Sequence, residues 1–257
     1  MMEFSAASMD LRAHVTSGGP SSQNEVRVPT IALLLPTLNE LEGLKATVPF
    51  IDRSLVSDII VIDGGSTDGT LEYAMEMGLT VASQLRPGLH AAIFDIAHVV
   101  THDCIIEFSP DGNCMVEQLP EIVQGLRAGN DMVVVSRYLA HAVSEDDHAV
   151  SAFGNWMFSR LMRPLARFQI TDALNIYRGY DRRILLDPDF ALYMRGPVLE
   201  PLVTGICALR DLKVIEVPGD EPLRIGGETK RSIIYNGSMV LLMIVRLYIR
   251  KFLGWRL

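Results

Sequence analysis

The chain has 257 residues, of which 49% are hydrophobic, and this is enough apolar side chain for one large domain with a buried core. Its formal net charge is −8 at pH 7, and it has no basic stripe with interleaved aromatic residues, which argues against a general nucleic-acid-binding protein. Its three cysteines, Cys104, Cys114 and Cys207, lack C-x-x-C spacing, which indicates reduced thiols in a cytoplasmic protein and no structural zinc site.

The N-terminal region, residues 1–28, is rich in Ser, Gly and Asn and has no continuous apolar segment. This composition predicts a flexible extension and not a signal peptide. The rest of the chain has no internal repeat and no low-complexity linker that would divide it. We therefore expect a folded domain at residues 29–225, followed by a C-terminal segment at residues 226–257.

Two apolar, β-branched runs, in Thr30–Glu40 and Asp58–Thr70, end abruptly in turn-forming and polar residues. Each predicts a buried parallel strand that delivers a polar loop to the ligand-binding edge of an α/β sheet. One helix, at about Glu42 to Leu55, is expected between them. No G-x-G-x-x-G follows a strand and no P-loop occurs, which argues against hydride transfer and P-loop phosphoryl transfer.

The segments "PTLNE" and "VIDGGSTDGT" resemble those of family-2 glycosyltransferases, and the branch they resemble most is the dolichyl-phosphate mannosyltransferase-like one. The resemblance implies an α/β domain with the GT-A (nucleotide-diphospho-sugar transferase) fold, in which helices flank a mostly parallel sheet. It also implies that Pro36, Glu40 and Asp63 contact the base and ribose of a UDP- or GDP-linked sugar. A carboxylate at a strand end accepts hydrogen bonds from ribose hydroxyls. The base stays open, because Leu38 and Gly64 differ from the family's Tyr and second Asp.

A further strand, expected at Cys104–Phe108, is followed by "SPDGN". In the family a D-x-D-x-Q segment binds Mg²⁺ or Mn²⁺ here, and the downstream "LPEIV" sets the register. The resemblance thus places Ser109 beside the donor and makes Asp111 and Asn113 the metal ligands. Oxygen ligands suit these hard cations. The alternative is that Pro, Asp and Gly here form only a tight turn.

Candidate phosphate-binding cations lie in two later segments of the chain. The strand expected at Asp131–Tyr138 contains Arg137 near its end, and the planar guanidinium of this residue matches phosphate oxygens. The segment Leu223–Ser232 resembles the family's "R-x-x-G-E-S-K", and it would bring Arg224 and Lys230 down as a glycine-hinged basic lid. The alternatives are an exposed arginine at a strand end and an ordinary solvated basic turn.

The segment "TDALNIYRGYDRRIL" resembles another family motif, with Asp172 and Arg178 at the matching positions. In the dolichyl-phosphate branch an arginine upstream, before residues matched here by Ser151 and Asn155, holds the acceptor phosphate. Here the acidic run Ser144–Asp147 stands in its place. This weakens the prediction of a phosphate acceptor and keeps open a saccharide hydroxyl, for which Asp172 would take the proton.

A strongly apolar helix is expected at Ile233–Leu253, interrupted toward its end by Arg246, Arg250 and Lys251. These charges argue against a membrane-spanning helix. Two alternatives stay open: an amphipathic helix lying on a membrane surface, or a helix packed against the catalytic domain or in a homo-oligomer.

The sequence therefore predicts a metal-dependent, inverting glycosyltransferase that uses a nucleoside-diphosphate sugar. The expected acceptor is a polyprenyl phosphate or a cell-envelope glycan precursor, and the expected location is the cytoplasm, peripherally on the inner face of the membrane. The alternatives are a soluble transferase to a small or saccharide acceptor and a non-catalytic nucleotide-sugar-binding protein. The predicted catalytic residues are Asp111, Asp172, Arg137, Arg224 and Lys230, and the predicted donor-binding residues are Pro36, Glu40, Asp63, Ser109 and Arg178.

Overall fold

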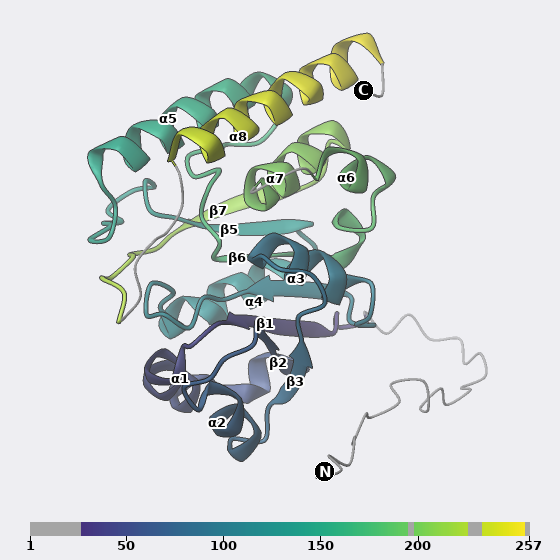
Figure 1. The fold of residues 1–257 in the computed structure, drawn as a ribbon. Helices are drawn as coiled ribbons and strands as arrows, with labels where there is room; N and C mark the ends of the chain where they lie inside the picture. Colours follow the sequence, from purple (N-terminus) through teal and green to yellow (C-terminus); the bar gives the residue numbers. More distant parts are fainter. Residues whose placement is uncertain (1–26, 195–197, 226–232, 255–257) are drawn as a thin grey trace, which may run out of the picture.

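The computed structural model of the chain describes residues 27–194, 198–225 and 233–254. Helices cover both faces of one central sheet (Figure 1). The seven strands are β1 (Ile31–Thr37), β2 (Asp58–Asp63), β3 (Thr80–Ser83), β4 (Cys104–Glu107), β5 (Met132–Ser136), β6 (Arg178–Asp181) and β7 (Val214–Pro218). The α-helices are α1 (Leu41–Thr47), α2 (Thr70–Glu76), α3 (Leu89–Ala97), α4 (Leu119–Arg127), α5 (Ala149–Met162), α6 (Pro188–Tyr193), α7 (Leu199–Leu209) and α8 (Ile233–Tyr248), which a π-helical turn (Ile249–Leu253) extends.

The strand order is β3-β2-β1-β4-β6-β5-β7, and every pairing except those of β6 is parallel. This confirms the expected α/β fold with a mostly parallel sheet. The antiparallel strand β6 was not predicted. It begins with Arg178 opposite Glu107, the last residue of β4. The residues just before β6 therefore lie at the edge where the parallel strands end, which is the edge that binds ligands in open α/β sheets.

The predicted strands at β1, β2, β4 and β5 are confirmed, whereas β3 and β7 were missed. The single helix predicted from about Glu42 to Leu55 was wrong in its length. Helix α1 ends at Thr47, and two 3₁₀ turns, Val48–Phe50 and Arg53–Leu55, follow it. Pro49 explains the early end, since proline has no backbone N–H with which to continue the helical hydrogen bonds.

Strand β1 shows how the sheet divides the core into two layers. Ala32 and Leu34 belong to one cluster of buried side chains, and Ile31, Leu33 and Leu35 belong to the other. All five are at most 1% exposed. Alternate residues of a strand point to opposite faces, so an unbroken apolar run is what a strand covered on both faces requires. The three cysteines are buried and reduced in the structure.

Helix α8 packs beside α5 and over α7 (Figure 1). Its side chains Val240, Met243, Ile244 and Leu247 are 0–4% exposed. Gly205 of α7 allows this close approach, because a Cβ there would lie 2.3 Å from Leu247 Cδ1. One face of the C-terminal helix is therefore part of the domain core.

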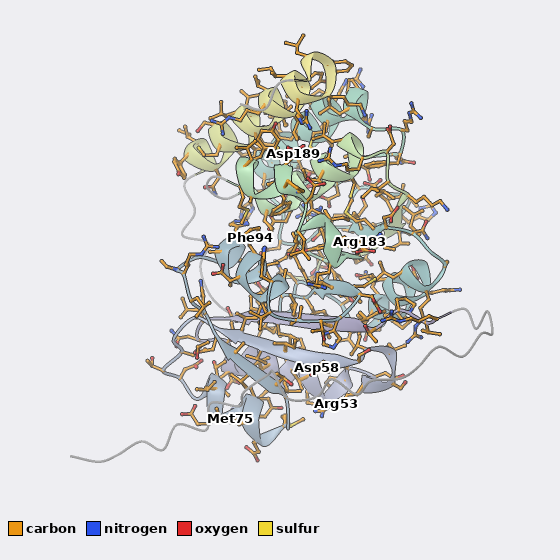
Figure 2. The ribbon with its side chains drawn as sticks, turned by 90° about the vertical axis from the view of Figure 1, so that its right-hand side faces the viewer. Arg53, Asp58, Met75, Phe94, Arg183 and Asp189 are labelled. Carbon is orange, nitrogen blue, oxygen red and sulfur yellow. The ribbon has the colours of Figure 1, made fainter. Side chains whose placement is uncertain are left out.

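An ion-pair cluster fastens the end of this helix to α6 and α7. Asp189, labelled in Figure 2, accepts hydrogen bonds from Arg250 Nε at 3.0 Å and from Arg210 Nη2 at 2.8 Å. Among the described residues, no helix has the length and apolar character needed to cross a bilayer.

Candidate active site

The loops after β1 and β2 lie together, because Thr37 and Asp63, the last residues of these strands, are register partners. The Asp63 carboxylate is 8% exposed and accepts hydrogen bonds from the backbone N–H groups of Gly65, at 3.0 Å, and Ser66, at 3.2 Å. Gly65 has φ +98°, a left-handed conformation that glycine adopts without a steric cost. Asp63 thus shapes the "GGST" turn at the edge of the sheet.

Glu40 connects this loop with the predicted metal motif. The pKa of Glu40 is raised from its ordinary value of 4.5 to about 7, mainly by partial burial and also by the nearby charge of Asp111, and the cation of Arg224 partly opposes this rise. Pro36 lies one strand position before Thr37 and is half-buried. The structure therefore brings together groups from the loops after β1 and β2, the "SPDGN" segment and the beginning of the predicted lid.

The "SPDGN" segment forms a turn with close contacts on two sides. Asn113 N donates to Asp111 Oδ1 at 3.2 Å, and Ser109 N donates to Cys114 Sγ at 3.3 Å. Gly112 has φ +92°, and a Cβ there would lie 2.8 Å from Ile225 Cγ1. On the other side, a Cβ on Gly43 of α1 would lie 2.2 Å from the Pro110 carbonyl oxygen. The turn is held between α1 and the segment before residue 226.

The donor groups of this turn fit a divalent cation of the magnesium type. Asp111 offers a carboxylate, and the buried Asn113 Oδ1 has no hydrogen-bond partner among the described residues. Mg²⁺ commonly binds one or two protein carboxylates and completes its shell with water and substrate phosphates. No group of three or more His, Cys, Asp or Glu side chains suited to a metal occurs in the described ranges. The residues thus fit a cation that shares its ligands with a substrate.

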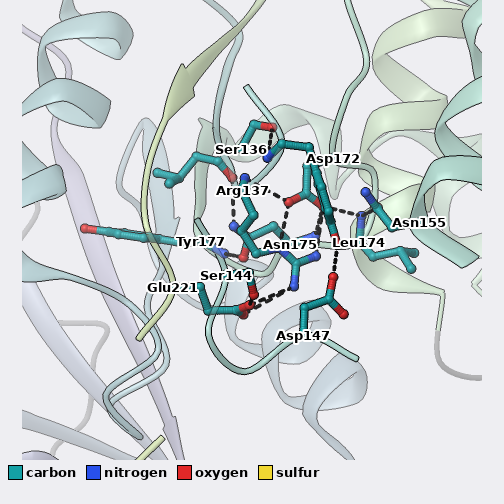
Figure 3. A network of polar contacts seen from close by, with 12 residues as sticks. Ser136, Arg137, Ser144, Asp147, Asn155, Asp172, Leu174, Asn175, Tyr177 and Glu221 are labelled. Atoms are coloured by element: carbon teal, nitrogen blue, oxygen red, sulfur yellow. Dashed lines mark hydrogen bonds and ion pairs between the residues drawn. The ribbon is translucent and has the colours of Figure 1, made fainter. Parts of the chain in front are cut away.

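Arg137 and Asp172 form a buried ion pair at the same edge (Figure 3). Arg137 Nε donates to Asp172 Oδ2 at 2.7 Å, and Nη2 donates to Oδ1 at 3.0 Å. Arg137 Nη1 also donates to Glu221 Oε2 at 3.1 Å. The side chains of Arg137 and Asp172 are 12% and 0% exposed. The two predicted catalytic residues therefore bind each other, and neither side chain points freely into solvent.

Arg178 lies in the core behind the site. It is 0% exposed, and it donates from Nε to the Asn175 carbonyl at 2.7 Å and from Nη1 to the Glu200 carbonyl at 2.8 Å. These bonds join the turn before β6 to the first turn of α7. The structure does not bring the Arg178 guanidinium to the loops of Glu40 and Asp63. Its contacts support a role in holding the turn that carries Asp172.

The predicted lid begins next to the metal motif. Ile225 N donates to the Asp111 carbonyl at 2.7 Å, which places Arg224 beside Asp111 and Asn113. Arg224 donates from Nε and Nη2 to Asp146 Oδ2, at 3.0 and 2.8 Å. Lys230, the other predicted lid cation, lies outside the described residues. Of the two predicted phosphate-binding cations that the structure describes, Arg137 and Arg224, the latter lies at the metal motif.

Sequence reasoning did not identify Asp146 and Glu221 as partners of the predicted cations. Glu221 binds Arg137, and Asp146 binds both Arg224 and Asn113. The acidic run Ser144–Asp147 was a signal that could have been used, since it stands where the family carries an arginine. Acidic side chains at the edge of a sheet that also collects arginines are natural ion-pair partners.

A cavity of about 530 Å³ opens between α3 and α6. Helix α3 begins after β3, so its first residues lie at the ligand-binding edge of the sheet. His90 Nδ1 lies 3.7 Å from Glu200 Oε2, and both side chains are largely buried. The cavity is lined by Arg86, Pro87, Gly88, His90, Ala91, Phe94, Ala191 and Met194. None of the predicted donor-binding residues lines this cavity.

Comparison with known proteins finds relatives whose sequences align with most of this chain. The dolichyl-phosphate hexose transferase of Haloferax volcanii is 29% identical over 229 residues, which cover 86% of this chain and 95% of that protein. The undecaprenyl-phosphate mannosyltransferase of Micrococcus luteus is 27% identical over 214 residues, covering 79% of this chain and 87% of that protein. These comparisons confirm the resemblance to the dolichyl-phosphate mannosyltransferase-like branch.

A solved structure shares the fold. Glucosyl-3-phosphoglycerate synthase from Mycobacterium tuberculosis, crystallised with Mn²⁺, UDP and phosphoglyceric acid, superposes with a TM-score of 0.60 at 21% sequence identity. The alignment covers 87% of this chain and 78% of that chain. The predicted GT-A fold is therefore confirmed.

The family is shown by a match over the part of the chain that contains most of the predicted site residues. Residues 32–187 match the sequence model described as "Glycosyl transferase family 2". This match spans more than half of the chain and includes Glu40, Asp63, Asp111, Arg137 and Asp172. The chain therefore belongs to glycosyl transferase family 2 and is a glycosyltransferase.

Proposed function

We propose that this glycosyltransferase moves a hexose, with inversion, from a nucleoside-diphosphate sugar to a polyprenyl phosphate. The observation that carries the donor half of the proposal is the convergence of Glu40, Asp111 and Arg224 at one edge of the sheet. Ile225 N donates to the Asp111 carbonyl at 2.7 Å, which places Arg224 beside Asp111, and the charges of both residues act on the pKa of Glu40. Glu40 and Asp63 supply oxygen acceptors for a nucleoside. Asp111 and Asn113 supply oxygen ligands for Mg²⁺ or Mn²⁺, and Arg224 supplies a cation for phosphate.

In this mechanism the acceptor oxygen attacks the anomeric carbon from the side opposite the nucleoside diphosphate. A divalent ion at Asp111 and Asn113, when bound, supplies positive charge that stabilises the departing diphosphate. Arg224 adds a second, fixed positive charge, and we propose that Lys230 does the same from the lid. A phosphate acceptor is already largely ionised near neutral pH, since its second pKa is about 6, so the enzyme needs no general base. Positioning and electrostatics then supply most of the rate enhancement.

The lipid-linked acceptor is supported by the names of the two relatives and by the outer faces of α5 and α8. Phe153 and Trp156 of α5 are 60% and 58% exposed, with their rings stacked at 5.7 Å. Leu241, Leu242 and Val245 of α8 are 45%, 43% and 47% exposed. Neither helix contains Asp or Glu. An apolar surface without acidic groups suits the interface of an anionic membrane, and we propose peripheral attachment of a cytoplasmic enzyme there.

A second acceptor class is favoured by one observation. Asp172 and Glu221 already neutralise Arg137, and Asp146 already binds Arg224, so the site holds less unpaired positive charge than a phosphate acceptor would prefer. A saccharide hydroxyl is neutral and would not need that charge. It would need a base, and Asp172 would be available only if Arg137 moved away from it.

The two acceptors can be distinguished by a transfer assay with a radiolabelled nucleotide-sugar. The proposal predicts label in the organic phase when polyprenyl phosphate is supplied in anionic vesicles. Label recovered only in water-soluble oligosaccharide would replace it with the second candidate. Replacing Phe153 and Trp156 by Ser should reduce transfer to vesicle-borne acceptor, while Phe50→Ser, which removes a ring that is 72% exposed elsewhere on the molecule, should not.

A further inference from the structure

We infer that Asp146 is a positioning residue that orients both the amide ligand of the metal and the arginine of the diphosphate site. This inference rests on the proposed function of that site. Asp146 belongs to none of the family motifs described above. It lies in the acidic run Ser144–Asp147, at the place where the family has an arginine. The structure supports it through three contacts that meet at one oxygen atom.

Asp146 Oδ2 accepts hydrogen bonds from two residues of the site. The Asn113 amide donates from Nδ2 at 3.1 Å. Arg224 donates from Nε at 3.0 Å and from Nη2 at 2.8 Å. The side chain of Asp146 is 22% exposed, so water competes only partly for these bonds. Hydrogen bonds in which both partners are charged are stronger than neutral ones, and a guanidinium binds an anion through a planar edge.

The bond to Asn113 determines which way its amide faces. While Nδ2 donates to Asp146, Oδ1 must point in another direction, and Oδ1 is the buried acceptor that lacks a partner among the described residues. A cation ligated by Asp111 and Asn113 would satisfy that oxygen. Side chains that orient a metal ligand in this way are worth roughly 10–100-fold in metal affinity. Without Asp146 the amide would be free to rotate and to offer Nδ2, which repels a cation.

The bonds to Arg224 fix the guanidinium beside the same motif. The backbone of this segment is already anchored, because Ile225 N donates to the Asp111 carbonyl at 2.7 Å. Gly112 permits the anchoring, since a larger residue would meet the Ile225 side chain. Asp146 then holds the Nε edge of Arg224, so that the guanidinium already lies at the proposed diphosphate site before the donor binds. Less side-chain freedom remains to be lost when the donor binds.

The loop that carries Asp146 is itself fastened to the segment that carries Arg224. Glu145 N donates to the Glu221 carbonyl at 2.8 Å, and Glu221 N donates to the Val143 carbonyl at 3.0 Å. Val143 N donates to Asp220 Oδ1 at 2.7 Å. Ser144 and Glu221 also form a parallel bridge. The position of Asp146 is therefore set by backbone contacts and does not depend on its own ion pair.

The test measures metal binding directly. Mn²⁺ is titrated by calorimetry into the full chain in the presence of UDP or GDP, whichever the wild type binds. We expect Asp146→Ala to weaken Mn²⁺ binding roughly tenfold or more. Asp146→Asn should retain part of the affinity, because its amide oxygen can still accept from Asn113 Nδ2. Glu145→Gln removes the same charge from an exposed neighbour in the same loop and should leave the affinity unchanged.

Two double variants separate positioning from a general effect of charge. In an Asn113→Ala background, Asp146→Ala should no longer change Mn²⁺ affinity. Asp146→Ala alone should also raise the KM for the donor, and in an Arg224→Ala background it should not. Equal Mn²⁺ affinity in wild type and Asp146→Ala, or tighter binding by the variant, would overturn the inference while leaving the proposed function intact. Absence of metal-dependent nucleotide binding by the wild type would overturn both.

Discussion

Replacing Asp172 by Ala should destabilise the protein strongly, because it leaves a buried guanidinium without its main partner. Asp172 is 0% exposed, and it accepts hydrogen bonds from Arg137 Nε and Nη2 and from the backbone N–H of Asn175. Removing one partner of a buried ion pair costs about 3–5 kcal/mol. Glu221 stays as a second partner for Arg137, so we expect the lower end, about 3 kcal/mol.

The assay is thermal unfolding without ligand, followed by circular dichroism. For a domain of this size, about 3 kcal/mol corresponds to a fall in Tm of about 6–12 °C. Asp95→Ala is the matched control, since it also removes the carboxylate of an Arg–Asp pair, but the side chain of its partner Arg86 is 57% exposed. An exposed pair contributes about 1 kcal/mol or less. If both variants unfolded at the same temperature, the conclusion that Asp172 and Arg137 form a stabilising buried pair would be refuted.

Two further predictions concern buried or partly buried charges. Because the folded-state pKa of Glu40 is raised to about 7, its contribution to stability is complete below its ordinary pKa of 4.5 and is lost as pH rises through about 7. Unfolding curves across this range should therefore show a smaller decline for Glu40→Gln than for wild type, and parallel declines would contradict the assignment. Arg178→Ala should cost about 3 kcal/mol or more, because it leaves a cavity and unpaired buried carbonyls. Arg183→Ala, a neighbour whose side chain is 79% exposed, should leave Tm nearly unchanged, and a similar loss in both would contradict the role given to Arg178.

The strands that carry the donor loops were predictable because they are buried on both faces. Such strands need unbroken apolar runs, and β1 and β2 have them. Strand β6 lacks this signal, since it reads Arg-Gly-Tyr-Asp. Its place between β4 and β5 depends on Gly179, where a Cβ would lie 2.5 Å from Ile122 Cγ2 of α4. That requirement comes from tertiary packing, which one sequence does not display.

The sequence indicated several residues of the candidate site but not how they pair. Arg137 and Asp172 were both predicted as catalytic residues, yet their mutual bonds join residues 35 positions apart. Arg178 matched a family motif, and only the fold shows that its guanidinium points into the core. Asp146 carried no motif at all. Ion pairing depends on which loops meet in space, and spacing along the chain does not determine that.

The most direct test of the proposed donor site is a calorimetric titration of UDP and GDP into the protein, with and without Mn²⁺, repeated with Asp111→Ala. We expect that one nucleotide binds, that binding requires the metal, and that Asp111→Ala abolishes the metal-dependent part. Binding of neither nucleotide, or equal binding with and without Mn²⁺ in both proteins, would contradict the claim that the "SPDGN" turn is a metal and diphosphate site.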